Sequence, residues 1–403
     1  MNGWQTMYKD KFPLFKKNDF VFLDSAASTQ KPQKVLDSLV SFYQNQYANV
    51  HRGSCHLASQ ATFLYEEARQ KIARFIHAPS EQVIFTKGAT ESINLVASGY
   101  RTLLKQDDEI LVSIAEHHAN FVSWQQVAKE TGAKFITFDI LENGEINLKD
   151  FEEKLSPRTK IVAFTHLSNV LGVVYPVKKM VDMAHKVGAK VLLDGAQSVA
   201  HLPVDMIDLD IDYFVFSGHK LYAPTGIGVL YGKSEALEIL PPYQFGGDMV
   251  EKVSVQETTF KSIPYKFEAG TPPFAEAIAL GTAIDFLSDI TMQKIEQDEK
   301  ELTQYLLKGL LDIDDVEIVA PNQNKQGIIS FVVKGVHPSD IAFTLSEQKI
   351  CIRLGHHCAI PIHNRLGYEA TLRVSLGLYN DKNDIDIFLN ALKKSISLFK
   401  GLN

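Results

Sequence analysis

Short, continuously apolar runs alternate with helical stretches between residues 20 and 232 of this 403-residue chain. Strand-like runs lie at 20–24, 82–86, 109–114, 134–140, 160–167, 190–194, 213–217 and 228–232, and the clearest helical stretches lie at 61–76, 91–104, 122–130 and 177–187. Runs without polar alternation are typical of strands that are covered on both faces, as in a parallel sheet. The pattern therefore predicts an α/β fold built on an open, mainly parallel sheet.

The pattern changes after about Ala275. Helical stretches follow at 275–288 and 292–311, then strand-like runs at 328–333, 350–354 and 371–376, a helix after Pro338, and an amphipathic helix at 384–400. Asn383 or Asp384 is expected to cap the start of this last helix and Gly401 its end. We predict a large domain over 19–285 and a smaller α+β C-terminal domain over 286–403, with 1–18 packed on the smaller one.

Composition narrows the classes of function. The net charge is −7, from 41 Lys and Arg against 48 Asp and Glu, and no basic stripe is evident, so nucleic acid is not an expected partner. No apolar run is long enough to span a bilayer, and the N-terminus lacks the apolar core of a signal peptide. Three cysteines cannot all pair with one another, which favours a reducing cytoplasm.

An amine and a carboxylate stand where two buried strands are expected to end. Asp194 closes the apolar run within 190–198, and Lys220 follows the run within 212–226. A parallel sheet presents its chemistry at such strand ends. This pair is what pyridoxal phosphate requires, because a lysine binds the cofactor covalently and an acid keeps its ring nitrogen protonated. The alternatives are a solvated loop at the lysine and a helix cap at the aspartate.

A strand, a glycine turn and a helix follow one another in segment 85–96. Ala89 and Thr90 would lie at the helix N-terminus, where free N–H groups and the helix dipole bind an anion such as phosphate. Thr90 as a simple N-cap is the alternative. Ser217 and His219, next to the lysine, are further candidate donors to the phosphate.

Three polar residues follow other expected strand ends and are candidates for contacts with the cofactor ring. Gln197 would reach the ring hydroxyl, His118 would stack on the ring and move protons, and Asn169 would also meet the ring. An ordinary polar loop is the alternative for the histidine. A metal site using His166, His117 and His118 is disfavoured, because the spacing matches no compact ligand set, and no metal is predicted.

Cys358 is the candidate nucleophile. It lies on a short loop, flanked by His356 and His357, which can favour its thiolate. The alternatives are a metal fragment, which three consecutive ligands make awkward, and a buried structural cysteine, which suits Cys351 better. Cys55 remains ambiguous.

Arg373 lies within an apolar strand, where a charge is costly without a partner. A guanidinium matches a carboxylate bidentately, so Arg373 is the candidate anchor for the α-carboxylate of an amino acid. Arg353, on the preceding strand, is a second candidate. A structural salt bridge is the alternative.

Several motifs together resemble one known family. They are DSAAS (24–28), NVHRGSCHLASQAT (49–62), GATESINLVA (88–97), EHHAN (116–120), THLSNVLG (165–172), FVFSGHKLYAPTGIGVLY (214–231), FEAGTP (267–272) and RLGHHCA (353–359). This combination resembles the Suf-type, or group II, cysteine desulfurases, which belong to the class V aminotransferase family of fold-type I enzymes. The resemblance implies an aspartate aminotransferase-like large domain and a homodimer with active sites at the subunit boundary.

The resemblance also implies roles for residues that match the motifs. Lys220 would bind pyridoxal phosphate, Asp194 would pair with its ring nitrogen, and the phosphate would be held by Thr90, Ser217 and His219. Thr271 would reach the phosphate in the neighbouring subunit, and His51 and Arg52 would line the partner's site. Arg373 would bind the substrate carboxylate, and Cys358 would accept sulfur. Ala89 departs from the threonine that is common in the family, so one hydroxyl is lost but the N–H remains.

The activity implied is conversion of L-cysteine to L-alanine with transfer of sulfur to Cys358 as a persulfide. The sulfur would pass to a SufE-like or SufU-like acceptor for iron–sulfur cluster assembly, and selenocysteine would be a second substrate. An aminotransferase or a kynureninase-like lyase shares the cofactor but does not need the cysteine loop. A scaffold without turnover would not need Lys220 and Asp194.

Overall fold

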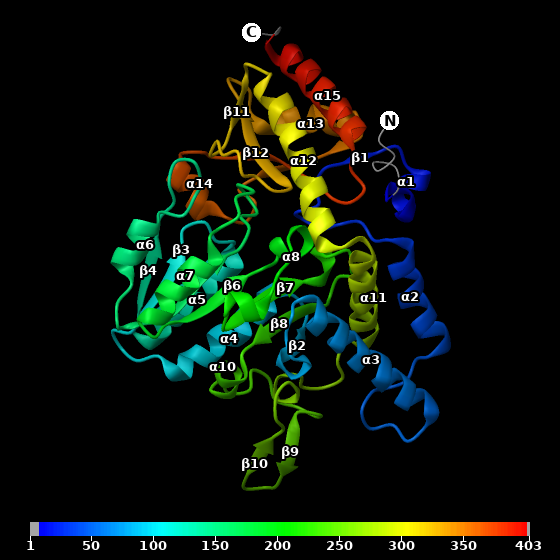
Figure 1. The fold of residues 1–403 in the computed structure, drawn as a ribbon, viewed down its shortest axis with the longest axis vertical. Helices are drawn as coiled ribbons and strands as arrows, with labels where there is room; N and C mark the ends of the chain where they lie inside the picture. Colours follow the sequence, from blue (N-terminus) through cyan, green and yellow to red (C-terminus); the bar gives the residue numbers. More distant parts are fainter. Residues whose placement is uncertain (1–7, 401–403) are drawn as a thin grey trace.

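The computed structural model describes residues 8–400 and contains a seven-stranded sheet at its centre (Figure 1). Its order is β2 (Val83–Thr86), β8 (Gly228–Gly232), β7 (Tyr213–Ser217), β6 (Lys190–Asp194), β5 (Thr159–Thr165), β3 (Glu109–Ser113) and β4 (Lys134–Phe138). Every pairing among β7, β6, β5, β3 and β4 is parallel, whereas β8 runs antiparallel to both of its neighbours. The predicted α/β fold with a mainly parallel sheet is confirmed.

Helices cover both faces of this sheet, which explains why its strands are apolar throughout. One face packs against α4 (Ala89–Leu103) and α5 (His118–Thr131), and the other against α3 (His56–Phe75), α7 (Val177–Lys186) and α11 (Phe274–Ile290). Successive residues of one strand serve opposite faces: Leu192 joins the core with α4, and Leu193 joins the core with α7. The polar residues at the strand ends are thereby left for the edge of the sheet.

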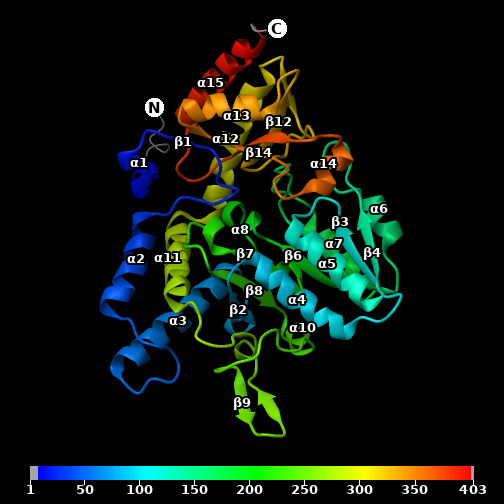
Figure 2. The same cartoon turned by 180° about the vertical axis from the view of Figure 1, so that it is seen from behind.

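A second sheet lies at one end of the molecule, next to the later helices (Figures 1 and 2). It has the order β11 (Val316–Ile318), β12 (Ile328–Val333), β15 (Thr371–Ser375) and β14 (Arg353–Gly355), with antiparallel pairing throughout. It shares a separate core with α12 (Met292–Leu311), α13 (Pro338–Glu347) and α15 (Lys382–Lys400). The predicted domain boundary at 285 falls within α11 and remains a prediction.

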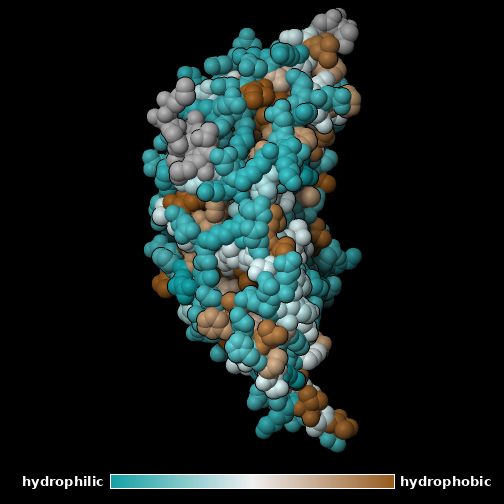
Figure 3. Space-filling model, turned by 90° about the vertical axis from the view of Figure 1, so that its right-hand side faces the viewer, coloured by the Kyte–Doolittle hydropathy of each residue, from teal (hydrophilic) through white to brown (hydrophobic). Residues whose placement is uncertain are grey.

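The structure also contains elements that the sequence pattern did not indicate. These elements are α1 (Pro13–Lys17), α2 (Gln33–Asn45), α6 (Leu148–Lys154), α8 (Ser198–His201), α9 (Met206–Leu209), α10 (Ser234–Glu238), α14 (Ile360–Leu366), the short 3-10 helices η1 (Lys9–Lys11), η2 (Ser80–Gln82), η3 (Gly218–Lys220) and η4 (Tyr265–Phe267), and the hairpin of β9 (Val250–Val253) and β10 (Thr258–Phe260). The hairpin projects from the end opposite the second sheet (Figure 1). Hydrophobic atoms gather at that end in Figure 3, and the side chain of Val255 between the two strands is 97% exposed.

Three element boundaries differ from those predicted. The run at 20–24 forms only β1 (Val21–Phe22), which pairs with β13 (Ile350–Cys351) and not with the large sheet. The run at 350–354 is split into β13 and β14 because its two halves pair with different strands. The last helix begins at Lys382, and its cap is Asp381, whose carboxylate accepts the N–H of Asp384 at 2.9 Å. The predicted cap at Gly401 lies outside the described residues.

None of the helices within residues 8–400 is both long and apolar enough to cross a membrane.

Candidate active site

A cavity of about 290 Å³ opens at the carboxyl edge of the large sheet. Asp194 ends β6, and Lys220 ends η3, which follows the adjacent parallel strand β7 directly. Eleven of the predicted site residues line this cavity: Ala89, Thr90, Asn169, Asp194, Gln197, Ser217, His219, Lys220, Arg353, Cys358 and Arg373. The residues that do not line it are His118, Thr271 and His51. We call Asp194, Gln197, Ser217 and Lys220 the sheet-edge site.

Burial sets the charge balance between the lysine and the aspartate. Desolvation lowers the pKa of Lys220, and the carboxylate of Asp194 opposes this shift. Burial likewise raises the pKa of Asp194, while the Ala196 N–H, which donates to its Oδ1 at 2.8 Å, and Lys220 act in the opposite direction. A lowered lysine pKa makes the neutral, nucleophilic amine more available near neutral pH.

The turn before α4 also borders the cavity, through Ala89 and Thr90. The Ser217 hydroxyl oxygen accepts the Ala89 N–H at 2.8 Å, which connects the end of β7 to the helix N-terminus. Glycine is required at the neighbouring position in β8, because a Cβ on Gly228 would lie 2.3 Å from the Cα of Gly88. The exposed Thr90 and this helix N-terminus are arranged to bind an anion.

Two arginines face the cavity from adjacent strands and share one carboxylate. Arg353 and Arg373 are directly opposite each other in β14 and β15. Asp24 accepts from Arg353 Nε at 3.1 Å and Nη2 at 2.9 Å, and from Arg373 Nη2 at 3.2 Å. The backbone carbonyl of Asn169 accepts from Arg373 Nη1 at 3.0 Å. Arg373 is only 2% exposed, and its burial lowers its pKa to about 10 despite the attraction of Asp24.

Residues 355–360, which we call the cysteine loop, connect β14 to α14. Cys358 is exposed and lies with His357 in consecutive left-handed conformations, with φ of 56° and 52°. Negative charge on its sulfur would be attracted by Arg373, Arg353 and Lys220. Burial lowers the pKa of His357 to about 2, so this imidazole is neutral and adds no positive charge beside the thiol.

Of the two adjacent histidines at the start of α5, His117 lines the cavity and the predicted His118 does not. His117 is the N-cap of α5, where its Nδ1 accepts the Ala119 N–H at 3.1 Å, so the ring proton is on Nε2. Burial and the nearby Lys220 lower its pKa to about 4, which keeps it neutral. His118 begins the helix and contacts the cysteine loop instead, with its Nε2 accepting the Ile360 N–H at 3.1 Å.

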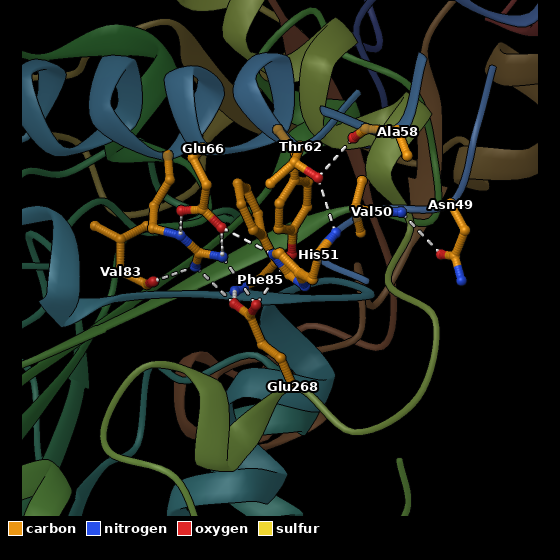
Figure 4. Close-up of polar contacts among 11 residues, drawn as sticks. Asn49, Val50, His51, Ala58, Thr62, Glu66, Val83, Phe85 and Glu268 are labelled. Atoms are coloured by element: carbon orange, nitrogen blue, oxygen red, sulfur yellow. Dashed lines mark hydrogen bonds and ion pairs between the residues drawn. The ribbon is translucent and has the colours of Figure 1, made fainter. Parts of the chain in front are cut away.

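His51 lies in a different polar cluster, shown in Figure 4. The backbone N–H of His51 donates to the Thr62 hydroxyl at 2.8 Å, and the Nε2 of its ring lies 3.2 Å from a Glu66 oxygen. Glu66 also accepts from Arg69, a buried side chain that forms an ion pair with Glu268 at 2.7 Å. The same network joins α3 to the segment AGTP (269–272), because Glu268 directly precedes that segment.

Thr271 lines a smaller cavity of about 100 Å³ together with Glu91, Tyr243 and Pro272. Arg52 pairs with Asp248 at 2.8 Å. The roles expected for these residues in a partner subunit remain predictions.

The groups around the cavity at the carboxyl edge of the sheet fit pyridoxal phosphate. They include an amine with a lowered pKa, a buried carboxylate, hydroxyl donors and a helix N-terminus. In addition, the buried Nε of Arg373 has no hydrogen-bond partner among the described residues. By contrast, within residues 8–400 there is no group of three or more His, Cys, Asp or Glu side chains suited to a metal ion. The three cysteines are free thiols.

Asp24 and His117 are the site residues that sequence reasoning did not single out. The signal for Asp24 was available, because two arginines on neighbouring strands need a shared anion. The side chains of adjacent histidines in a loop cannot be told apart from sequence alone.

Comparison with known proteins gives a consistent result. The class-V aminotransferase family matches residues 21–388. A protein of Vibrio cholerae named a probable cysteine desulfurase is 48% identical, covering 94% of this chain and 95% of the relative, and one of Halalkalibacterium halodurans with the same name is 47% identical over 97% and 98%. The crystal structure of the Escherichia coli cysteine desulfurase CsdA is 39% identical with a TM-score of 0.91, covering 97% of this chain and 98% of that one.

Proposed function

Because the chain belongs to the class-V aminotransferase family, we propose that it is a pyridoxal phosphate-dependent cysteine desulfurase. The observation that carries this proposal is that Lys220, Asp194, Arg373 and Cys358 line one cavity. The relatives at 47–48% identity that are named probable cysteine desulfurases support it. An aminotransferase would have no use for a thiol at this position.

Different residues of the cavity bind the substrate and move the proton. Arg373 and Arg353 bind the α-carboxylate of L-cysteine, and Asp24 holds both guanidinium groups toward the cavity. Lys220 Nζ, whose pKa is lowered by burial, takes the proton from the substrate α-carbon in its neutral form. When bound, pyridoxal phosphate accepts the electrons that this deprotonation releases. Asp194, buried next to the lysine, keeps the ring nitrogen protonated.

Cys358 then receives the sulfur. Its thiolate attacks the substrate sulfur, so that an S–S bond forms and the carbon–sulfur bond breaks. The carbon that loses sulfur gains a proton, and L-alanine leaves. The balance is one free thiol and L-cysteine in, one persulfide and L-alanine out, with no outside oxidant. His117, neutral beside Lys220, is positioned to stack on the ring and to donate from Nε2.

The wider setting is also part of the proposal. We propose a homodimer in which Thr271 and His51 serve the neighbouring site, a cytoplasmic location, and transfer of sulfur to a SufE-like or SufU-like acceptor for iron–sulfur cluster assembly. L-Selenocysteine is proposed as a second substrate, because selenium leaves carbon more readily than sulfur does.

The test is alanine formation from L-cysteine by the holoenzyme, with and without a reducing thiol, for wild type and Cys358→Ser. Alanine that requires Cys358 and forms faster with added thiol is expected, because the thiol regenerates the free cysteine. Alanine formation unchanged by the substitution would instead indicate a lyase in which Cys358 has no role.

A further inference from the structure

The cysteine loop has a conformation that it cannot hold by itself. His357 and Cys358 are both left-handed, with φ of 52° and 56°, and neither is a glycine. Such a conformation is unfavourable for a residue that carries a Cβ, and it persists only where surrounding contacts impose it. The contacts that do so are therefore functionally relevant, because they set the direction of the Cys358 sulfur.

Contacts from three separate segments hold this loop. The Asn169 side-chain amide donates to the His357 carbonyl at 2.8 Å, and the Thr371 hydroxyl lies 2.8 Å from His357 Nε2. The third segment is the start of α5. There the His118 N–H donates to the Cys358 carbonyl at 2.7 Å.

His118 makes a second contact with the loop, through its side chain. Its Nε2 accepts the Ile360 N–H at 3.1 Å, so one residue holds the loop at two points, the Cys358 carbonyl and the Ile360 N–H. The acceptor must be an unprotonated nitrogen, because the backbone N–H can only donate. Burial and the neighbouring His356 lower the pKa of His118, which favours this neutral form.

The same residue connects the loop to the cavity. His117, the adjacent residue, lines the cavity, and α5 packs on the sheet whose edge carries Lys220. The loop is thus positioned relative to the sheet-edge site through two consecutive histidines with different functions. One faces the cavity, and the other holds the loop.

We propose that His118 is a positioning residue, whose imidazole holds the Cys358 thiol in line with the substrate sulfur through the Ile360 N–H. This rests on the proposed function. The imidazole acts on the loop backbone through the Ile360 N–H, so its loss should slow sulfur transfer without changing how L-cysteine binds.

Three variants of His118 test whether the hydrogen bond to the Ile360 N–H matters, as distinct from the imidazole itself. A glutamine can place its amide oxygen near the position of Nε2, whereas asparagine and serine are too short to reach the Ile360 N–H. All three are polar, and all three keep the backbone bond to Cys358. Holoenzymes of H118Q, H118N and H118S are compared with wild type for kcat and KM in alanine formation, and for hydrogen exchange in the peptide that contains Cys358 and Ile360.

In H118N and H118S, hydrogen exchange in this peptide should be faster, and kcat should fall about tenfold with KM for L-cysteine unchanged. In H118Q, both the exchange rate and kcat should be close to those of wild type. Faster exchange with an unchanged kcat would overturn the proposal, as would an H118Q variant as defective as H118N. Failure of both shorter variants to retain cofactor, when H118Q retains it, would make the contact a requirement of folding and also overturn it. A wild type that forms no alanine would refute the proposed function itself.

Discussion

The sheet-edge site and the cysteine loop carry two halves of one reaction, yet they are built in opposite ways. Asp194 and Ser217 lie at strand ends, are 5% and 7% exposed, and have their places set by parallel and antiparallel pairing. Cys358 is exposed and left-handed, and the residues on either side of it in the loop are held by side chains from three other segments. The comparison teaches that groups which must keep a fixed geometry, such as Asp194, lie on regular structure. A group that must also pass sulfur to another molecule, such as the Cys358 thiol, lies at the surface.

The largest expected effect comes from removing the sheet-edge amine. Lys220→Ala should reduce alanine formation by at least about 10³-fold, because one amine both binds the cofactor and moves the proton. The absorbance of the lysine-bound cofactor should disappear. Lys149→Ala, at a lysine that is 85% exposed on α6, is the matched control and should retain full activity. Turnover by Lys220→Ala at even a tenth of the wild-type rate would contradict the account.

The arginine that lies between the two regions is expected to have the next largest effect. Arg373→Lys keeps the charge but loses the planar fork, and should lower kcat/KM for L-cysteine about 10²-fold, mainly through KM. Steady-state kinetics measure this. Arg365→Lys, which changes an arginine paired with Asp139 and Glu142, is the control and should leave KM unchanged. An unchanged KM in Arg373→Lys would show that another group binds the carboxylate.

Gly228→Ala should damage the anion-binding turn before α4, beside the sheet-edge site, and leave the cysteine loop unchanged. The added methyl group would lie 2.3 Å from Gly88 Cα, so the anion-binding turn must shift, at a cost of about 1–3 kcal/mol. Weaker retention of the cofactor and a lower Tm are expected, with hydrogen exchange in the cysteine loop unchanged. Gly247→Ala, where a Cβ would have nothing within 4 Å, is the control. Full retention of cofactor by Gly228→Ala would mean that the turn is not part of the site.

Thr371→Val should affect the cysteine loop and leave the sheet-edge site unchanged, with a smaller effect than Gly228→Ala. It removes the hydroxyl that contacts His357 Nε2 at 2.8 Å and His363 Nε2 at 3.1 Å. A loss of about 1–2 kcal/mol in stability and a several-fold lower kcat are expected, with cofactor absorbance unaltered. Thr344→Val is the control, since that hydroxyl bonds only to carbonyls of its own helix. Loss of cofactor in Thr371→Val would show that the two regions are not independent.

The sheet-edge site could be predicted from sequence because its signals are local. An apolar run that stops on Asp194 or just before Lys220 places each residue at a strand end, and the parallel sheet then brings the strand ends together. The turn at Ala89 and Thr90 is equally local, since strand, glycine and helix follow one another directly.

The contacts of the cysteine loop could not be predicted in this way. His118 and Ile360 are 242 positions apart, so no periodicity connects them. Which of two adjacent histidines faces the cavity depends on the exact start of α5, and boundaries are the least certain part of a pattern. The hairpin β9–β10 was missed for a different reason, because its strands lie outside all three hydrophobic cores and carry no buried apolar run.

The central claim is that Cys358 takes sulfur from the substrate held at the sheet-edge site. The most direct measurement is a single turnover of the holoenzyme with L-cysteine and no added thiol, in which alanine is counted and each cysteine-containing peptide is examined by mass spectrometry. The account predicts one alanine per persulfide, with the persulfide on Cys358 and not on Cys55 or Cys351. Alanine without a persulfide on Cys358 would contradict it.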